Sequence, residues 1–342
     1  VMVKSYPIIS CTGGTIQKNL VNVRKTIGRP DIKNIPVVVI GIVGKFRSGK
    51  STLLNHLYRS FTGETEDIFK AAGGIQRITD GIELSEPIIL PRDGEDIALF
   101  LLDAQGSDDT RESLQMAAAV FGLAAAMSST IIYNIEKRID TNDLQLFDRF
   151  ANRGFLKNSK AKRNLLFLVR NWVDDKHYAF GFDGGNAYLQ QELRTNMGGE
   201  HNDNARQHIR DSFNYDCYLM QYPGDDVARG DTKQLPDYFV QQMDDIHEKI
   251  ERADCYAIGD HTFTASDLNT FFMSLHNEIL TKLPQLDRPS VDSTLVAENL
   301  ELKERLAEFE KKTDYSGFFL ANFEKVLDAF NNAVTLISKF KK

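Results

Sequence analysis

The chain has 342 residues, 42% of them hydrophobic and 26% charged, which is typical of a soluble globular protein with room for two domains. Its formal net charge of −7 argues against a nucleic-acid binder, because phosphate neutralisation needs clustered Lys and Arg. Cys11, Cys217 and Cys255 lack the spacing of a disulfide scaffold or zinc site, which favours a reducing, cytoplasmic compartment.

The predicted elements alternate between strands and helices along most of the chain. Residues 7–22 predict an irregular strand and a short helical stretch, and the β-branched run over 35–43 predicts a strand buried on both faces. A helix is predicted from Ser51. Further predicted elements are strands over 82–90 and 97–102 with a turn at 91–95, a helix over 116–127, and strands over 129–135, 165–170 and 217–220. This alternation predicts a doubly wound α/β domain with a mostly parallel central sheet.

The pattern changes near residues 286–291, beyond which no strand signal remains. Apolar residues between Leu295 and Ile337 recur at spacings of three and four, which predicts two amphipathic helices. We therefore expect an α/β domain over residues 1–287, a linker over 288–292 and a helical domain over 293–342. No stretch approaches the roughly 18 to 20 apolar residues of a membrane span.

Residues 44–51 read GKFRSGKS and meet the spacing G-x(4)-G-K-S between a predicted strand and a predicted helix. The glycines allow backbone amides to close around phosphate oxygens, Lys50 is expected to reach the β- and γ-phosphates, and Ser51 to bind Mg²⁺. This predicts a nucleoside triphosphate site. Its predicted contacts here are Gly44, Lys45, Phe46, Arg47, Ser48, Gly49, Lys50, Ser51 and Thr52.

Two further segments are candidates for the metal and the γ-phosphate. Asp103 to Gly106 (DAQG) directly follow an apolar strand, so Asp103 is expected to hold Mg²⁺ and the Gly106 amide to contact the γ-phosphate. Thr79, in a Gly-rich segment, is expected to offer its hydroxyl to Mg²⁺ when triphosphate is bound. In isolation, either segment would more often be an ordinary surface turn.

Arg47 is unusual because it places a guanidinium inside the phosphate-binding segment. It either acts as an arginine finger in cis, offsetting the charge that develops during phosphoryl transfer, or is a solvated loop residue. The spacing does not decide between these two roles.

Together these motifs, with Thr79–Ile82 and Val169–Trp172, resemble the atlastin and guanylate-binding-protein branch of the dynamin superfamily. Asp183–Gly185 and Pro223–Gly224 fit atlastins better than guanylate-binding proteins. The resemblance runs from about Val37 to the first C-terminal helix. It implies a large GTPase domain over residues 1–287 and a helical middle domain, a bundle that residues 293–342 are too short to complete.

The resemblance also implies an activity and partners. The expected enzyme is a Mg²⁺-dependent GTPase that binds GTP and GDP and forms a nucleotide-dependent homodimer, with Arg47, Lys50, Thr79 and Gln76 as catalytic residues. Atlastin-like proteins tether and fuse endoplasmic reticulum membranes through an anchor that lies outside this chain. The expected location is the cytosolic face of that membrane.

Two departures from the family pattern keep alternatives open. Arg170 and Asn171 occupy the base-reading positions, where the family has Arg-Asp, and an amide in place of the carboxylate should weaken guanine binding by about 1–3 kcal/mol. Xanthine would suit Asn171 better, and the alternative is that Asp174 or Asp175 supplies the missing carboxylate. Ile75 replaces a Ser near the attacking water, with Gln76 as a possible substitute. An NTPase of relaxed specificity and a nucleotide-switched scaffold with little turnover therefore remain alternatives.

Overall fold

The computed structural model describes residues 4–12, 15–45, 48–70, 81–104, 120–140, 143–144, 163–194, 206–207, 209–228, 235–258 and 260–282. Its strands are β1 (Ser5–Thr12), β2 (Thr15–Lys18), β3 (Val37–Gly44), β4 (Gly81–Ser85), β5 (Ile88–Arg92), β6 (Glu95–Ala104), β7 (Thr130–Glu136), β8 (Arg163–Arg170), β9 (Phe213–Leu219), β10 (Ala257–Ile258) and β11 (His261–Thr262). The helices are α1 (Leu20–Lys25), a 3₁₀ turn (Pro30–Ile32), α2 (Lys50–Thr62), α5 (Phe182–Glu192), α7 (Asp225–Ala228), α8 (Asp237–Glu251) and α9 (Ala265–Lys282).

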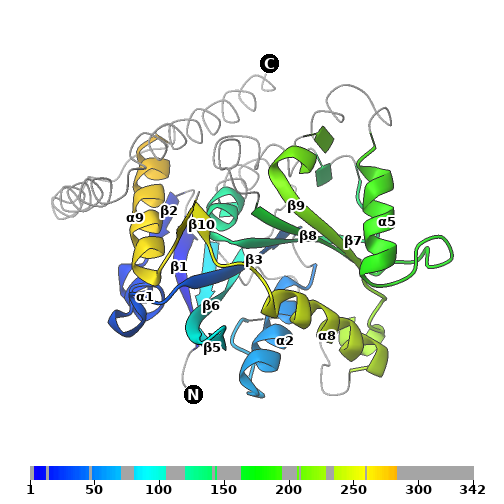
Figure 1. Ribbon diagram of the computed structural model, residues 1–342, viewed down its shortest axis with the longest axis horizontal. Helices are drawn as coiled ribbons and strands as arrows, with labels where there is room; N and C mark the ends of the chain where they lie inside the picture. The colour runs from blue at the N-terminus through cyan, green and yellow to red at the C-terminus, as the bar shows by residue number, and fades with distance from the viewer. Residues whose placement is uncertain are drawn as a thin grey trace.

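One large sheet organises the described part of the chain (Figure 1). Its strand order is β2-β1-β4-β6-β3-β7-β8-β9, with β5 paired to β6. The strands from β6 through β3, β7 and β8 to β9 run parallel, and β4, β1 and β2 add an antiparallel edge. The predicted mostly parallel α/β domain is confirmed. Because β6 and β7 lie on opposite sides of β3, the chain leaves β3 at a topological switch point, where such sheets bind ligands.

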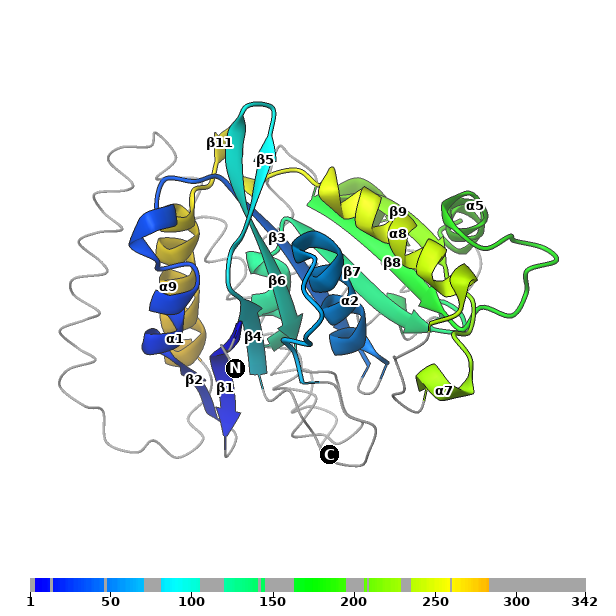
Figure 2. The ribbon, with the colours of Figure 1, turned by 90° about the horizontal axis from the view of Figure 1, so that it is seen from below.

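Alternate residues of β3 face two separate hydrophobic cores. Val38, Ile40 and Ile42 pack towards α2 and α8, which lie beside each other on one face (Figures 1 and 2). Val37 and Val39 pack towards the opposite core, to which α1, α5, α9 and the helical residues 120–127 contribute. Burial on both faces explains why this strand is a continuous β-branched run.

The sequence prediction was wrong about the segment over 82–90. It is two strands, β4 and β5, interrupted at Glu86 and Pro87, because β4 pairs with both β1 and β6 whereas β5 returns along β6 as a hairpin. The hairpin turn is Asp93–Gly94, with φ of 54° and 89°, a left-handed pair that Asp-Gly sequences favour. The last parallel strand, predicted over 217–220, begins earlier, at Phe213.

Helices α5, α8 and α9 lie where the sequence analysis assigned no element. The predicted helix over 116–127 is helical over its described part, 120–127. The linker at 288–292 and the helical domain over 293–342 lie outside the described residues and remain predictions.

Candidate nucleotide-binding site

The phosphate loop, residues 44–51, joins the end of β3 to the start of α2, and Phe46 and Arg47 within it lie outside the described residues. Two glycines shape it. Gly44 has φ of 149°, and a Cβ there would lie 2.3 Å from the carbonyl oxygen of Asn134, a backbone atom. Gly49 has φ of 75°, a left-handed conformation that L side chains rarely adopt, and it lies against the Arg170 guanidinium. Glycine is therefore favoured at both positions.

Two strand ends hold the middle of the phosphate loop. The carbonyl oxygen of Ser48 accepts hydrogen bonds from Nδ2 of Asn134 at 2.8 Å and from Nη1 of Arg170 at 2.7 Å. Asn134 is 1% exposed. Burial lowers the pKa of Arg170 to about 10, against the opposing effect of Glu136, so the guanidinium stays charged at neutral pH. The loop is thus fixed by the carboxyl ends of β7 and β8.

The start of α2 provides positive charge. Its N-cap is Gly49, which makes no side-chain capping bond, so the amides of the first turn face the loop. Lys50 is 7% exposed, and its ammonium donates to the carbonyl oxygen of Lys45 at 2.9 Å. A buried ammonium at a helix N-terminus matches an anionic polyphosphate.

The structure brings together two of the three predicted metal ligands. Oγ of Ser51 donates to Oδ2 of Asp103 at 2.5 Å, and Asp103, near the end of β6, is 1% exposed. This contact follows from the parallel β3–β6 register, in which Ile42 is the partner of Asp103. A hydroxyl and a carboxylate are hard oxygen ligands of the kind Mg²⁺ prefers, so the residues fit that ion.

Glu83 is an acidic neighbour that sequence reasoning missed. It is the register partner of Asp103 across β4 and β6 and accepts a hydrogen bond from Oγ of Ser5 at 2.9 Å. Burial raises the pKa of the Glu83 carboxyl, the Ser5 bond opposes this, and the charge of Asp103 adds to it. The antiparallel β4–β6 pairing was not predicted, so nothing in the sequence linked these two residues.

The predicted base-reading pair separates in the structure. Arg170 turns to the phosphate loop, whereas Asn171, the next residue, has φ of 56° at the end of β8. Asn is one of the few residues that adopt this left-handed conformation readily.

The residues after Asn171 are engaged elsewhere. Trp172 is 6% exposed, its Nε1 donates to the carbonyl oxygen of Tyr178 at 3.0 Å, and its ring centroid lies 4.7 Å from that of Tyr188. Asp174 contacts Nδ1 of His177 at 2.6 Å. Trp172 is therefore part of an aromatic cluster in the core, and Asp174 is partly committed to a local pair.

Thr52, another predicted contact, lies in the first turn of α2 and is half-buried. The other predicted site residues, Phe46, Arg47, Gln76, Thr79 and Gly106, lie outside the described residues.

Comparison with known proteins identifies the family of this chain. The sequence model of the family "Guanylate-binding protein, N-terminal domain" matches residues 17–253. The chain belongs to this family. The family match spans the phosphate loop and all the strands from β3 to β9. The expected resemblance to the atlastin and guanylate-binding-protein branch is confirmed.

Atlastins are among its relatives. The chain is 30% identical to mouse atlastin-1 over 269 residues, which is 70% of this chain and 48% of the relative. It is 32% identical to atlastin-1 of Pongo abelii over 237 residues and 31% identical to human atlastin-2 over 241 residues. These matches cover 42% and 40% of the two relatives, so the chain spans half or less of their length.

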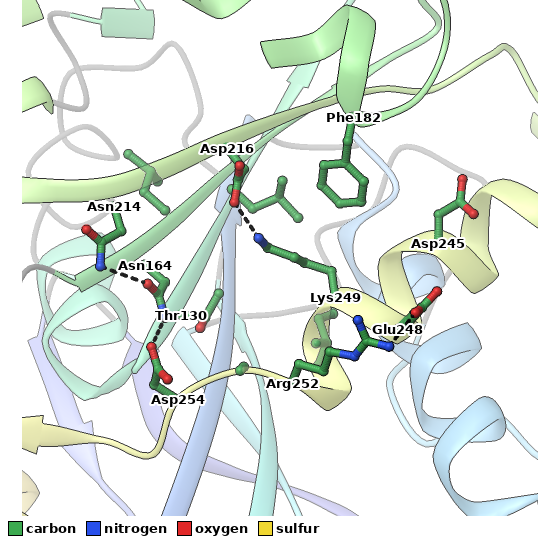
Figure 3. Close-up of a pocket in the computed structure, with 14 residues that line it drawn as sticks. Thr130, Asn164, Phe182, Asn214, Asp216, Asp245, Glu248, Lys249, Arg252 and Asp254 are labelled. Atoms are coloured by element: carbon green, nitrogen blue, oxygen red, sulfur yellow. Dashed lines mark hydrogen bonds and ion pairs between the residues drawn. The ribbon is translucent and has the colours of Figure 1, made fainter.

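A cavity of about 440 Å³ lies away from the phosphate loop (Figure 3). It is formed at the amino ends of β7, β8 and β9, near the end of α8. Its polar groups pair with each other: Lys249 contacts Asp216 at 2.5 Å, and Nδ2 of Asn164 donates to Asp254 at 3.1 Å. None of the predicted site residues lines it. It is therefore distinct from the phosphate loop, which follows the carboxyl end of β3.

The described part of the chain contains no helix long and apolar enough to cross a membrane. Nor does that part hold three or more His, Cys, Asp or Glu side chains arranged around a metal position. A Ser–Asp pair that completes its shell with phosphate oxygens and water, as Mg²⁺ sites in nucleotide-binding proteins do, needs no such cluster.

Proposed function

We propose that this chain binds a Mg²⁺-complexed guanine nucleotide at the carboxyl ends of β3 and β6 and hydrolyses GTP. The observation that carries the proposal is the hydrogen bond between the Ser51 hydroxyl and the buried Asp103 carboxylate, at the start of a helix whose first residue is the buried Lys50. Membership of the guanylate-binding-protein family supports guanine as the base.

Each described residue has a role in this proposal. The Lys50 ammonium and the first-turn amides of α2 bind the β- and γ-phosphate oxygens and offset their charge. Ser51 and Asp103 hold Mg²⁺, which when bound neutralises phosphate charge. Asn134 and Arg170 keep the loop in its wrapped form through the Ser48 carbonyl.

Four residues outside the described ranges complete the proposed nucleotide site, and three of them, Arg47, Thr79 and Gln76, are proposed as catalytic. Arg47 offsets charge that develops on the transferred phosphoryl group, Thr79 adds a metal ligand, Gln76 orients the attacking water, and the Gly106 amide contacts the γ-phosphate. The motif spacings and the family membership support these roles.

A second candidate function is hydrolysis of a nucleotide other than GTP, and Asn171 favours it. A carboxylate accepts hydrogen bonds from both guanine N1–H and N2–H₂, whereas Asn171 offers one acceptor oxygen and an NH₂ donor. Xanthine carries a carbonyl in place of the C2 amine and so matches that donor.

Phosphate release from GTP, ATP and XTP, each with Mg²⁺ and with EDTA, tests both candidates. Turnover restricted to GTP and dependent on Mg²⁺ supports the first function. Faster turnover of XTP or ATP supports the second. Binding without turnover of any nucleotide would instead support a nucleotide-switched scaffold and contradict both.

We also propose that the nucleotide drives homodimerisation, as part of membrane tethering and fusion at the cytosolic face of the endoplasmic reticulum, with the membrane reached through a segment outside this chain. The similarity to atlastins supports this wider role. Light scattering coupled to size-exclusion chromatography should show a doubled mass with GDP and aluminium fluoride and a monomer without nucleotide. A monomer under both conditions would contradict the dimer.

A further inference from the structure

Lys45, the second residue of the phosphate loop, turns its side chain towards an acidic turn that follows β7. We define the acidic turn as residues 137–140 and 143–144. Nζ of Lys45 lies 3.0 Å from Oδ1 of Asp143 and 3.8 Å from Oδ2 of Asp140. The Asp143 side chain is only 3% exposed, whereas that of Lys45 is 53% exposed. The pair therefore joins a flexible cation to a fixed, buried carboxylate.

The Asp143 carboxylate is held by the turn itself. Its Oδ2 accepts from the backbone N–H of Asp140 at 3.1 Å, and Oδ1 of Asp140 accepts from the N–H of Asp143 at 2.8 Å. The hydroxyl of Tyr133, on β7, donates to the Asp143 carbonyl at 3.1 Å. Burial raises the pKa of Asp143 and the charge of the Asp140 carboxylate adds to this, while the Asp140 N–H and the Lys45 ammonium act in the opposite direction. The charged form therefore depends on its cation.

The backbone of Lys45 contacts the proposed phosphate-binding lysine. Its carbonyl oxygen accepts the hydrogen bond from Nζ of Lys50. Lys45 thus connects Asp143, through its side chain, to Lys50, through its carbonyl. The same turn also reaches the other support of the loop, because the N–H of Lys137 donates to the carbonyl of Arg170 at 2.7 Å.

We propose that Asp143 is a positioning residue for the phosphate loop, which it fixes by holding the Lys45 side chain. The inference rests on the proposed nucleotide function and adds to it a residue from outside the sequence motifs. Through Lys45, Asp143 sets the orientation of the peptide whose carbonyl holds the Lys50 ammonium.

Burial of the Asp143 side chain distinguishes this pair from ordinary surface ion pairs, in which both partners are exposed. Exposed pairs contribute little because solvent screens both partners. Removal of the cation leaves this buried carboxylate with the Asp140 N–H as its hydrogen-bond donor within the described part of the chain, which favours rearrangement of the turn or protonation of the acid. Either change releases Lys45 and so loosens the loop.

The test is a double-mutant cycle read out as GDP affinity with Mg²⁺, using the full chain. Lys45→Met and Asp143→Asn should each weaken binding by about 3- to 10-fold, and the double variant should bind no more weakly than the poorer single variant. Lys45→Arg, which keeps a cation, should restore most of the affinity. Lys249→Met is the matched control. It breaks the Lys249–Asp216 ion pair beside the cavity at the amino ends of the parallel strands, and this variant should bind GDP as tightly as the wild type.

The pH dependence of GDP affinity is a second measurement, and a purely structural role of Asp143 would not change it. Lowering the pH from neutral protonates Asp143 at a higher pH than an ordinary aspartate, because its pKa is raised, so wild-type affinity should fall. The affinity of Asp143→Asn should not show this fall. Protonation of the nucleotide's own phosphates affects both proteins equally, so the difference between their pH profiles reports on Asp143.

The possible results distinguish failure of the Asp143 positioning role from failure of the proposed nucleotide function. Thermal unfolding of each variant confirms that it is folded. Unchanged affinity in Asp143→Asn, or independent and multiplying effects of the two substitutions, would overturn the positioning role while leaving the nucleotide site intact. Failure of the wild type to bind any nucleotide would refute the proposed function and this inference with it.

Discussion

The phosphate side and the base side of the proposed nucleotide site differ in how far their groups are pre-arranged. On the phosphate side, Ser51 already contacts Asp103, Lys50 is held by the Lys45 carbonyl, and the Ser48 carbonyl is held from two strands. On the base side, Asn171 adopts a left-handed backbone conformation at the end of β8, and Trp172 belongs to the core. The difference indicates that polyphosphate affinity and base choice rest on separate residues, which substitutions should be able to separate.

The largest effect is expected from Lys50→Ala. It removes a buried ammonium from the start of α2 and should abolish triphosphate binding for every base, because the phosphate side supplies the affinity. Equilibrium titration with fluorescent GTP, ATP and XTP analogues measures the loss. Lys249→Ala, a lysine substitution at the far sheet edge, serves as control. Retained binding of any triphosphate would contradict the claim that Lys50 supplies affinity for the phosphates.

Arg47→Ala should separate binding from turnover on the phosphate side. If the guanidinium acts on the transition state, turnover should fall by ~10²-fold or more while nucleotide affinity stays close to that of the wild type. Single-turnover phosphate release beside a binding titration gives both quantities. An unchanged rate would assign Arg47 the role of a solvated loop residue.

Asn171→Asp should act on base choice alone. A carboxylate restores both acceptors for guanine, so the ratio of GDP to XDP affinity should rise by about 5- to 150-fold, the equivalent of roughly 1–3 kcal/mol. Aspartate also tolerates the left-handed backbone that Asn171 adopts. Asp175→Asn, a change at an exposed neighbour, should leave the ratio unaltered. An unchanged ratio in Asn171→Asp would mean that the base is read by other residues.

The smallest effect on the nucleotide is expected from Trp172→Phe. This change removes the hydrogen bond from Nε1 to the Tyr178 carbonyl and part of the packing against Tyr188, so the free energy of unfolding should drop by about 1–3 kcal/mol. Nucleotide affinity and base preference should not change. Urea unfolding and GDP and XDP titrations measure the two properties. A shift in base preference would instead indicate that Trp172 contacts the base.

What the sequence predicted was local. The phosphate loop could be located because its glycines, Lys50 and Ser51 are set by spacing between one strand and one helix, and Asp103 because it closes an apolar strand. These features depend on neighbours within a few residues, or on the common carboxyl edge of parallel strands. The contact between Ser51 and Asp103, the two proposed metal ligands that the structure describes, follows from that common edge.

What the sequence did not predict depends on contacts between distant segments. Glu83 meets Asp103 only because β4 runs antiparallel to β6, and Asp143 meets Lys45 only because the acidic turn folds over the start of the phosphate loop. Arg170 was expected at the base, and its contact with Ser48 spans 122 residues of sequence. No periodicity or spacing carries such long-range pairings.

Isothermal titration calorimetry of the wild-type chain with GDP, in Mg²⁺ and in EDTA, tests the central claim most directly. The claim is that residues 44–51 enclose a polyphosphate, with a metal ion held beside it by Ser51 and Asp103. We expect saturable heat at one site per chain in Mg²⁺, weaker binding in EDTA, and loss of that difference in Asp103→Asn. Absence of heat with GDP, GTP, XDP and ADP alike would contradict the account.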